Sequence, residues 1–246
     1  MRLYGVDVHA FCWPDFSTGS LKGQEDAVIS YANFVILALT GPLDNKRLSG
    51  AYCKGEGSTM IYLIRHGQTE LNSRHVLQGR SDYPLNASGI AQAKAAAEML
   101  KGVRFDYVYT SPLQRAVQTA GLVAPEITPV VDERLIEMDY GPYEGADLHH
   151  LPPEILTFFS DFVHHPAPAG MEPLASVVAR TGAFLEEIRS LEGNILLSLH
   201  AISMKGMLEY LTPDSHGAYW SKTIGNCAIY TALNHDGRVE IPVEIK

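Results

Sequence analysis

The stretch Met60-Ile61-Tyr62-Leu63-Ile64-Arg65-His66-Gly67 decides the fold. Its first five residues form a short apolar run typical of a buried parallel strand, and the run stops abruptly at Arg65. Two later apolar runs end in the same way, because residues 106–110 lead into Ser111-Pro112-Leu113-Gln114-Arg115 and residues 194–199 lead into His200. We therefore predict three buried strands, each of which ends in a polar group able to handle phosphate.

Helical patterns lie between these strands. The apolar positions of residues 87–101 fall on one stripe that ends at Gly102, and Pro112 suits the first turn of a second helix over residues 112–123. Strands that alternate with helices predict an α/β fold, here a three-layer α/β/α sandwich with a mostly parallel sheet and a lid insertion. The remaining predicted elements are helices at residues 174–192 and 201–211 and a hairpin of residues 228–233 and 239–245 around a turn at 234–237.

The lid insertion is the polar, proline-rich region of residues 139–173, which contains a short helical candidate at residues 154–163. Phe158, Phe159 and Phe162 are expected to pack in the core of this lid. A substrate-facing aromatic wall is the alternative interpretation of the same three residues.

The composition changes near Met60, since residues 41–59 are rich in Gly, Ser and Lys, as linkers are. We interpret residues 1–59 as an N-terminal extension that is non-native or poorly ordered, either an upstream misassigned start or a fusion remnant. Residues 60–246 then form the functional domain. The apolar residues 27–40 are shorter than the roughly 20 residues that a membrane helix needs, and no basic region directly precedes them, so neither a membrane span nor a signal peptide is expected.

The composition is that of a globular protein with a full core, because 46% of the 246 residues are hydrophobic. A formal net charge of -9 argues against binding to nucleic acid or to an anionic membrane, so phosphate must be bound by a few placed arginines. The cysteines are odd in number and scattered, which favours a reducing cytoplasm. The histidine pairs 149–150 and 164–165 are expected to be solvated, since adjacent histidines point away from each other and no carboxylate pattern completes a metal site.

The three predicted strand ends should meet at one place, because ligands of open α/β sheets bind outside the carboxyl ends of the strands. Phosphoryl transfer needs a nucleophile, donors for the phosphate oxygens, and an acid for the leaving oxygen. His66 is the candidate nucleophile, and the guanidinium groups of Arg65 and Arg115 would bind phosphate while keeping the imidazole neutral. His200 would add a third positive donor if it is protonated.

Glu137 is the candidate for the general acid, and later for the base that activates water. It has nearby rivals in Glu133, Asp139 and Glu144. Its place before the turn at residues 141–145 favours it.

Two stretches resemble the signatures of the histidine phosphatase superfamily, also called the phosphoglycerate mutase-like family. Residues 63–72, followed by Leu77-Gln78-Gly79-Arg80 and Pro84-Leu85-Asn86, are similar to the first signature, and residues 111–120 to the second. The resemblance runs from about Met60 to the C-terminus. It implies that His66 is phosphorylated, that Arg65, Arg115 and His200 form the phosphate pocket, and that Glu137 is the proton donor. It also implies substrate contacts by Asn72, Gln78 and Gly79, and no metal or cofactor.

One departure from the family lies beside His200. Members usually have Ser-His-Gly after this strand, whereas the chain has Ser198-Leu199-His200-Ala201. Ala201 adds a methyl group where backbone approaches the phosphate, so we expect a slightly altered substrate pocket there.

We predict a phosphatase that hydrolyses a small phosphate monoester through a phosphohistidine, with a small phosphorylated metabolite as its partner. The segment between Glu137 and His200 is modest in length, whereas mutases of the family usually carry longer insertions. The first alternative is a phosphoglycerate mutase-type transfer, which would need a closed lid that excludes water. The second is a non-catalytic phospholigand-binding module.

Overall fold

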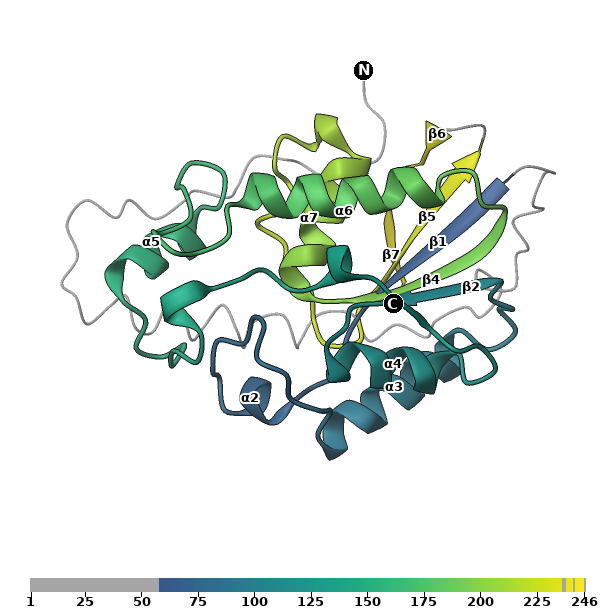
Figure 1. Cartoon of the computed structure of the whole chain (residues 1–246), viewed down its shortest axis with the longest axis horizontal. Coiled ribbons are helices and arrows are strands. Elements are labelled where there is room, and N and C mark those ends of the chain that lie inside the picture. Colours follow the sequence, from purple (N-terminus) through teal and green to yellow (C-terminus); the bar gives the residue numbers. More distant parts are fainter. Residues whose placement is uncertain (1–57, 236–237, 241, 246) are drawn as a thin grey trace, which may run out of the picture. The chain divides into compact units, whose positions relative to one another are not determined.

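The computed structural model describes residues 58–235, 238–240 and 242–245, so the interpretation of residues 1–57 lies outside the described residues. Within the described residues, seven strands form one sheet in the order β3-β2-β4-β1-β5-β6, with β7 paired to β5 (Figure 1). The strands are β1 (Ser58–Arg65), β2 (Tyr107–Thr110), β3 (Val130–Val131), β4 (Gly193–Leu199), β5 (Ile229–His235), β6 (Arg238–Val239) and β7 (Val243–Ile245).

The sheet has a parallel half and an antiparallel edge. Strands β3, β2, β4 and β1 run parallel, while β5 is antiparallel to β1 and pairs in the antiparallel sense with β6 and β7. The register places Arg65 opposite Leu199, and Thr110 opposite Ser198. The three predicted strand ends therefore lie at the same level of the sheet.

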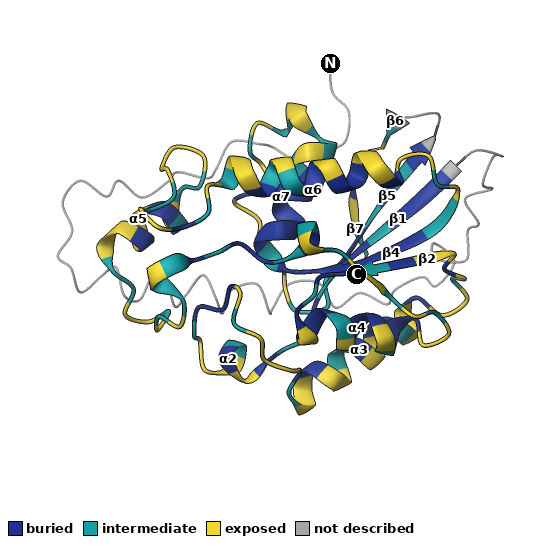
Figure 2. Ribbon diagram, in the orientation of Figure 1, coloured by how far each residue is buried: buried dark blue, intermediate teal, exposed yellow. Residues whose placement is uncertain are grey.

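Helices cover both faces of the sheet (Figure 1). On one face, α3 (Ala87–Met99) and α4 (Gln114–Val123) pack through Ala96 and Ala120 against Ile64 and Leu196. On the other face, α6 (Leu174–Ile188) and α7 (Ala201–Leu211) pack against Leu63 and Leu197, because neighbouring residues of a strand point to opposite faces. Figure 2 shows this burial in the central strands and in the inner sides of the helices. The expected three-layer α/β/α fold with a mostly parallel sheet is confirmed.

The segment 139–173 contains α5 (Pro153–Ser160), and its aromatic residues pack in a cluster shared with residues outside the segment, among them Ile202 and Trp220. Phe158 is fully buried, and its ring centroid lies 4.8 Å from that of Phe162, which in turn lies 6.2 Å from that of Trp220. Phe159 packs against the same cluster. These three phenylalanines thus form a hydrophobic core, as expected from the sequence.

Several element bounds differ from the predicted ones for local physical reasons. Helix α4 begins at Gln114 and not at Pro112, because the amide of Gln114 donates to Asp82 Oδ1 at 2.7 Å and so starts the helix there. Helix α6 ends at Ile188, four residues early, before a turn that reaches Gly193 with φ 123°. The short helix α2 (Glu70–Ser73) and strand β3 were missed because elements of this length show no periodicity.

Strand β1 starts two residues before the predicted domain boundary at Met60. Thr59 is 3% exposed and pairs with Gly193 on β4 and Asn234 on β5. Its hydroxyl donates to the carbonyl of Leu191. Residues 58 and 59 are therefore part of the sheet. No helix in the described part of the chain is long and apolar enough to cross a lipid bilayer.

Candidate active site

The structure brings His66, Arg115 and His200 together at the carboxyl ends of the parallel strands. The Arg115 Nε donates to both His66 Nε2 and His200 Nδ1, at 3.2 Å each, and the two imidazole centroids lie 5.0 Å apart. His66 follows β1, His200 follows β4, and Arg115 lies in the first turn of α4, which follows β2. All three side chains are buried. One guanidinium therefore links two histidines that are far apart in the sequence.

The hydrogen bonds of His66 indicate which ring nitrogen can act as a nucleophile. Nδ1 lies 2.7 Å from the carbonyl oxygen of Gly67, which can only accept, so Nδ1 carries the proton. Nε2 then carries no proton, and its lone pair accepts a hydrogen bond from Arg115. Burial, followed by the charges of Arg115 and Arg65, lowers the pKa of His66 well below its ordinary value of 6.5. The imidazole is therefore neutral near pH 7.

The backbone around His66 is held from three directions. The Gly67 amide donates to Thr119 Oγ1 at 3.0 Å, and the Asn226 side-chain amide donates to the carbonyl of His66 at 3.0 Å. A Cβ atom on Gly67 would lie 2.5 Å from the carbonyl oxygen of Gly89 in α3, so only glycine fits there. These contacts fix the position of the imidazole relative to the sheet.

Arg115 is fully buried, and its other nitrogens bind backbone carbonyls. Nη2 donates to Gly79 O at 2.6 Å and Nη1 to Ser81 O at 2.7 Å. The carboxylate of Glu144 accepts from the amides of the same two residues, Gly79 at 2.9 Å and Ser81 at 3.1 Å. Burial lowers the pKa of Arg115 to about 10, so the guanidinium stays charged at neutral pH. Glu144 thus shapes the loop that holds Arg115.

Arg65 supplies a second guanidinium whose donors are only partly used. Its Nη1 donates to the carbonyl of Ile224 at 2.5 Å, whereas its Nε is buried with no hydrogen-bond partner within the described residues. Burial lowers its pKa, and the charge of Glu137 opposes this effect. A buried donor without a partner costs free energy unless an acceptor binds to it. Arg65 therefore offers a site for an anionic oxygen.

His200 was expected to be a positive donor only if it is protonated, and its hydrogen bonds indicate which ring nitrogen carries a proton here. Its Nδ1 accepts from Arg115 and its Nε2 lies 2.7 Å from Ser111 Oγ, so Nε2 carries the proton. Burial, then the charge of Arg115, lowers the pKa of His200 well below 6.5. Burial and the neighbouring guanidinium therefore favour the neutral ring.

Glu137 lies buried at the N-terminus of α7, with 4% of its surface exposed. Its Oε1 accepts from the amide of Ser203 at 3.0 Å, and its Oε2 accepts from the amide of Ile202 at 3.2 Å. Its own neighbour Met138 donates to Oε1 at 2.8 Å. These backbone donors fix the orientation of the carboxyl group beside His200.

The three rivals of Glu137 have other places. Glu144 binds the loop of Gly79 and Ser81, Asp139 forms an ion pair with Arg80 at 3.3 Å, and Glu133 is exposed in a short 3₁₀-helix. Glu137 alone among these four accepts from the amides that follow His200.

The predicted substrate contacts form a connected, largely buried group near His66. Gln78 Oε1 accepts from the hydroxyl of Thr69 at 2.6 Å and from Asn72 Nδ2 at 3.5 Å. Asn226 Nδ2 lies 3.4 Å from Asn72 Oδ1 and so connects this group to His66. Gly79 is linked through Arg115. Ala201 is the first residue of α7 and is partly exposed.

The sequence did not reveal the roles of four residues that support the site. Thr119 and Asn226 bind the backbone around His66, Ser111 binds the ring of His200, and Glu144 supports the loop of Gly79. Thr119 stands four residues after Arg115, which is one helical turn, and its hydroxyl also donates to Arg115 O at 2.7 Å. That spacing could have been noticed. Asn226 lies in a loop without any pattern, so no sequence signal pointed to it.

The model of the histidine phosphatase superfamily (branch 1) matches residues 61–243. The chain belongs to this superfamily. Phosphoserine phosphatase 1 of Hydrogenobacter thermophilus is 29% identical to this histidine phosphatase over 192 residues, which are 75% of the chain and 90% of the relative. A 2,3-bisphosphoglycerate-dependent phosphoglycerate mutase of Methylobacterium sp. (strain 4-46) is 34% identical over 169 residues, 62% of the chain and 80% of the relative.

A solved structure is also similar to this histidine phosphatase. It is the H9A mutant of phosphoserine phosphatase from Entamoeba histolytica in complex with phosphoserine, with a TM-score of 0.66 and 28% identity over 76% of this chain and 95% of that chain. These likenesses confirm the expected family, the fold class and the phosphomonoesterase class of enzyme. Relatives of the mutase type are present as well.

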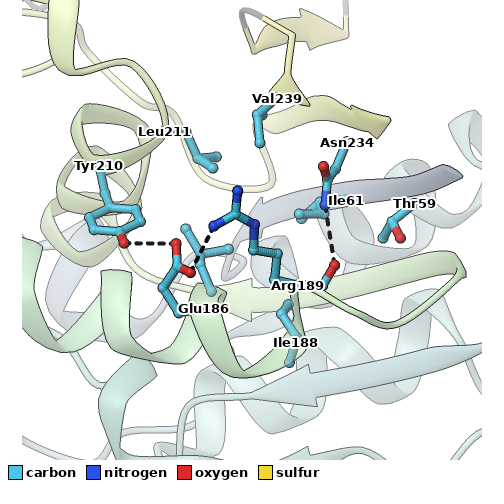
Figure 3. A pocket seen from close by; sticks show the side chains of 10 residues that line it. Thr59, Ile61, Glu186, Ile188, Arg189, Tyr210, Leu211, Asn234 and Val239 are labelled. Atoms are coloured by element: carbon cyan, nitrogen blue, oxygen red, sulfur yellow. Dashed lines mark hydrogen bonds and ion pairs between the residues drawn. The ribbon is translucent and has the colours of Figure 1, made fainter. Parts of the chain in front are cut away.

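A separate pocket of the histidine phosphatase lies away from this site (Figure 3). Its walls come from the C-terminal ends of α6 and α7, the start of β1 and the end of β5. These strand ends lie at the edge of the sheet opposite to His66. Glu186 accepts there from Tyr210 at 2.9 Å and pairs with Arg189 at 3.1 Å. None of the predicted site residues lines it.

Proposed function

We propose that this histidine phosphatase hydrolyses small phosphate monoesters through a phosphohistidine on Nε2 of His66. One observation carries the proposal. The Nδ1 proton of His66 is held by the carbonyl of Gly67, so the lone pair of Nε2 points at the Arg115 guanidinium, where a phosphate group would be bound.

The reaction has two steps. In the first, the His66 Nε2 lone pair forms a bond to phosphorus, the bond from phosphorus to the leaving oxygen breaks, and that oxygen takes a proton from Glu137. In the second, water attacks phosphorus, the phosphorus–nitrogen bond breaks, and the Glu137 carboxylate takes the proton of the water. His66 and Glu137 return to their starting states when phosphate leaves.

Arg65, Arg115 and His200 are proposed to bind the three non-bridging oxygens of phosphate. Support comes from the Nε of Arg65, which has no hydrogen-bond partner within the described residues, and from the Arg115 Nε that both imidazoles share. A phosphate dianion between the rings would also oppose the fall in the pKa of His200, so a bound substrate favours its protonated, donating form.

Asn72, Gln78 and Gly79 are proposed to contact the substrate beyond its phosphate, and Ala201 to border the pocket. Residues 139–173 are proposed to act as a lid over this side of the domain that follows residue 59. The relatives named phosphoserine phosphatase make a small phosphorylated acid such as phosphoserine the first substrate to test. The net charge of -9 supports a metabolite in place of a nucleic acid or a membrane as partner, and the scattered cysteines support a cytoplasmic location.

Phosphate release from a panel of monoesters, including phosphoserine, tests the proposal. The wild type should release phosphate, and His66→Ala should lower kcat/KM by at least about 1000-fold. Acid-labile phosphate on the protein, trapped during turnover, should be present in the wild type and absent in His66→Ala. Turnover that survives in His66→Ala contradicts the phosphohistidine mechanism.

A mutase reaction is the second candidate, since a mutase is among the relatives. The same assay with 3-phosphoglycerate, followed for both free phosphate and isomers, separates the two. Isomerisation without phosphate release identifies the mutase. Binding of monoesters with neither outcome identifies a non-catalytic module.

A further inference from the structure

A largely shielded ion pair outside the phosphate pocket binds the backbone on both sides of Glu137. Glu172 is the penultimate residue of the segment 139–173, and Arg180 lies about two turns later in α6. The Arg180 Nε lies 2.8 Å from Glu172 Oε1 and its Nη2 lies 3.2 Å from Oε2, so the pair is bidentate. The side chains are 15% and 9% exposed. A shielded pair of this geometry is held far more firmly than an exposed one.

The third nitrogen of Arg180 reaches the chain next to Glu137. Its Nη1 donates to the carbonyl of Ile136 at 2.6 Å and to the carbonyl of Arg134 at 2.7 Å. The guanidinium therefore binds the backbone directly before Glu137 while it is itself oriented by Glu172.

Glu172 binds the same segment on the other side of Glu137. Its Oε2 accepts from the amide of Asp139 at 3.2 Å, and its own amide donates to the carbonyl of Asp139 at 2.8 Å. Arg80 at 3.4 Å and the hydroxyl of Ser176 at 3.2 Å complete the ring of donors around this carboxylate. The ion pair thus fixes residues 136 and 139, which flank Glu137.

We propose that the Glu172–Arg180 pair is a positioning device for Glu137, which places the carboxyl group so that it can protonate the leaving oxygen. The inference rests on the proposed role of Glu137. The carboxyl group itself is held by amides of α7, and its backbone is held from α6 by Arg180. Neither Glu172 nor Arg180 hydrogen-bonds to His66, Arg115 or His200 in the described structure. The charge of Arg180 is the last of the causes that lower the pKa of His200, so the hydrogen bonds to the backbone beside Glu137 carry the inference.

The test compares two substrates with different leaving groups. A nitrophenolate leaves without a proton, whereas the alkoxide of glycerol 2-phosphate needs one. Because kcat/KM reports only the steps up to release of the leaving group, it isolates the acid role of Glu137. Arg180→Met should lower kcat/KM for glycerol 2-phosphate by about 10- to 100-fold and for p-nitrophenyl phosphate by less than about threefold.

Matched variants complete the set. Arg180→Lys and Glu172→Gln should show the same selective loss to a smaller degree, since each keeps part of the contacts. Arg104→Met is the matched control, because this arginine is exposed and lies outside the network around Glu137. It should leave kcat/KM for both substrates unchanged. Thermal unfolding of each variant identifies any that fail to fold. If Arg180→Met fails to fold, the kinetics of Arg180→Lys and Glu172→Gln test the inference in its place.

The double variant E137Q/R180M gives the decisive result. If Arg180 acts through Glu137, the double variant should lose no more activity towards glycerol 2-phosphate than E137Q alone. Equal losses of kcat/KM for both substrates in Arg180→Met overturn the positioning role but not the proposed role of Glu137. Additive losses in the double variant do the same. An E137Q variant without selective loss overturns the proposed role of Glu137, and the positioning role with it.

Discussion

The Nε of Arg115 lies 3.2 Å from Nε2 of His66, the ring nitrogen proposed to attack phosphorus. This hydrogen bond occupies the lone pair that the reaction needs. A substrate oxygen must therefore take over the Nε–H before attack can occur. Because a phosphate oxygen is a stronger, charged acceptor than an imidazole, this exchange binds the substrate and frees the nucleophile in one event.

Arg115→Lys should lower kcat/KM for phosphate release by about 100- to 1000-fold, because one ammonium cannot bind the Gly79 and Ser81 carbonyls and also face both imidazoles. Steady-state kinetics measure the effect. Arg104→Lys is the matched control, since this arginine is exposed, and it should keep wild-type kinetics. A loss below about tenfold in Arg115→Lys contradicts the proposed role.

The buried histidines should make the protein less stable in mild acid. Both His66 and His200 have a lowered pKa in the folded state, so below pH 6.5 the unfolded chain binds more protons than the folded chain. The free energy of unfolding should therefore fall with falling pH from about 6.5, by up to about 1.4 kcal/mol per pH unit for each histidine. Urea unfolding at several pH values between 5 and 7.5 measures this slope.

Single substitutions assign the slope to these residues. His200→Gln should reduce the slope between pH 6.5 and 5, whatever its effect on the absolute stability. His165→Gln should leave it unchanged, because His165 is exposed. An unchanged slope in His200→Gln would mean that its pKa in the folded state is ordinary.

The fold could be predicted because each central strand carries a largely apolar run that leads into polar residues. The run before Arg65 and the run before His200 needed no tertiary information. Convergence of the site could be predicted because ligands of open α/β sheets bind at the carboxyl ends of the strands, and the register of β1 and β4 agrees with it. The parts that failed depend on contacts distant in sequence. The start of α4 at Gln114 is set by Asp82, which lies 32 residues away.

The site was predictable for residues with a reactive side chain and not for those that hold them. His66, Arg115 and Glu137 stand out by chemical type. Asn226 acts by donating to a backbone carbonyl 160 residues earlier, and any polar residue would look alike in the sequence. The charge of His200 also needed the structure, because its pKa depends on burial and on the neighbouring guanidinium.

Ala201→Gly tests the departure from the usual family pattern. Ala201 is partly exposed, and it is not among the non-glycine residues with positive φ, so its backbone does not require glycine. We expect kcat/KM to change by less than about threefold and the free energy of unfolding to fall by about 1 kcal/mol or less, the usual cost of glycine in a helix. A rise in kcat/KM of tenfold or more would show that the methyl group obstructs the substrate.

Gly89→Ala and Gly121→Ala form a matched pair, because both glycines lie in helices that cover the same face of the sheet. A Cβ on Gly89 would lie 2.1 Å from the carbonyl oxygen of Gln68, whereas a Cβ on Gly121 meets nothing within 4 Å. Gly89→Ala should lower the free energy of unfolding by about 1 to 3 kcal/mol. Gly121→Ala should raise it by about 0.5 to 1 kcal/mol, since alanine is the better helix former.

Gly89→Ala should also lower kcat/KM, whereas Gly121→Ala should not. Gln68 is two residues from His66, so the backbone shift forced by Gly89→Ala displaces the imidazole, and kcat/KM should fall by about 100-fold for a displacement near 1 Å. Gly121→Ala should keep wild-type kcat/KM. Denaturant unfolding and phosphate release on the same preparations measure both effects. A Gly89→Ala protein that is as stable and as active as the wild type contradicts the close packing of α3 on the loop after His66.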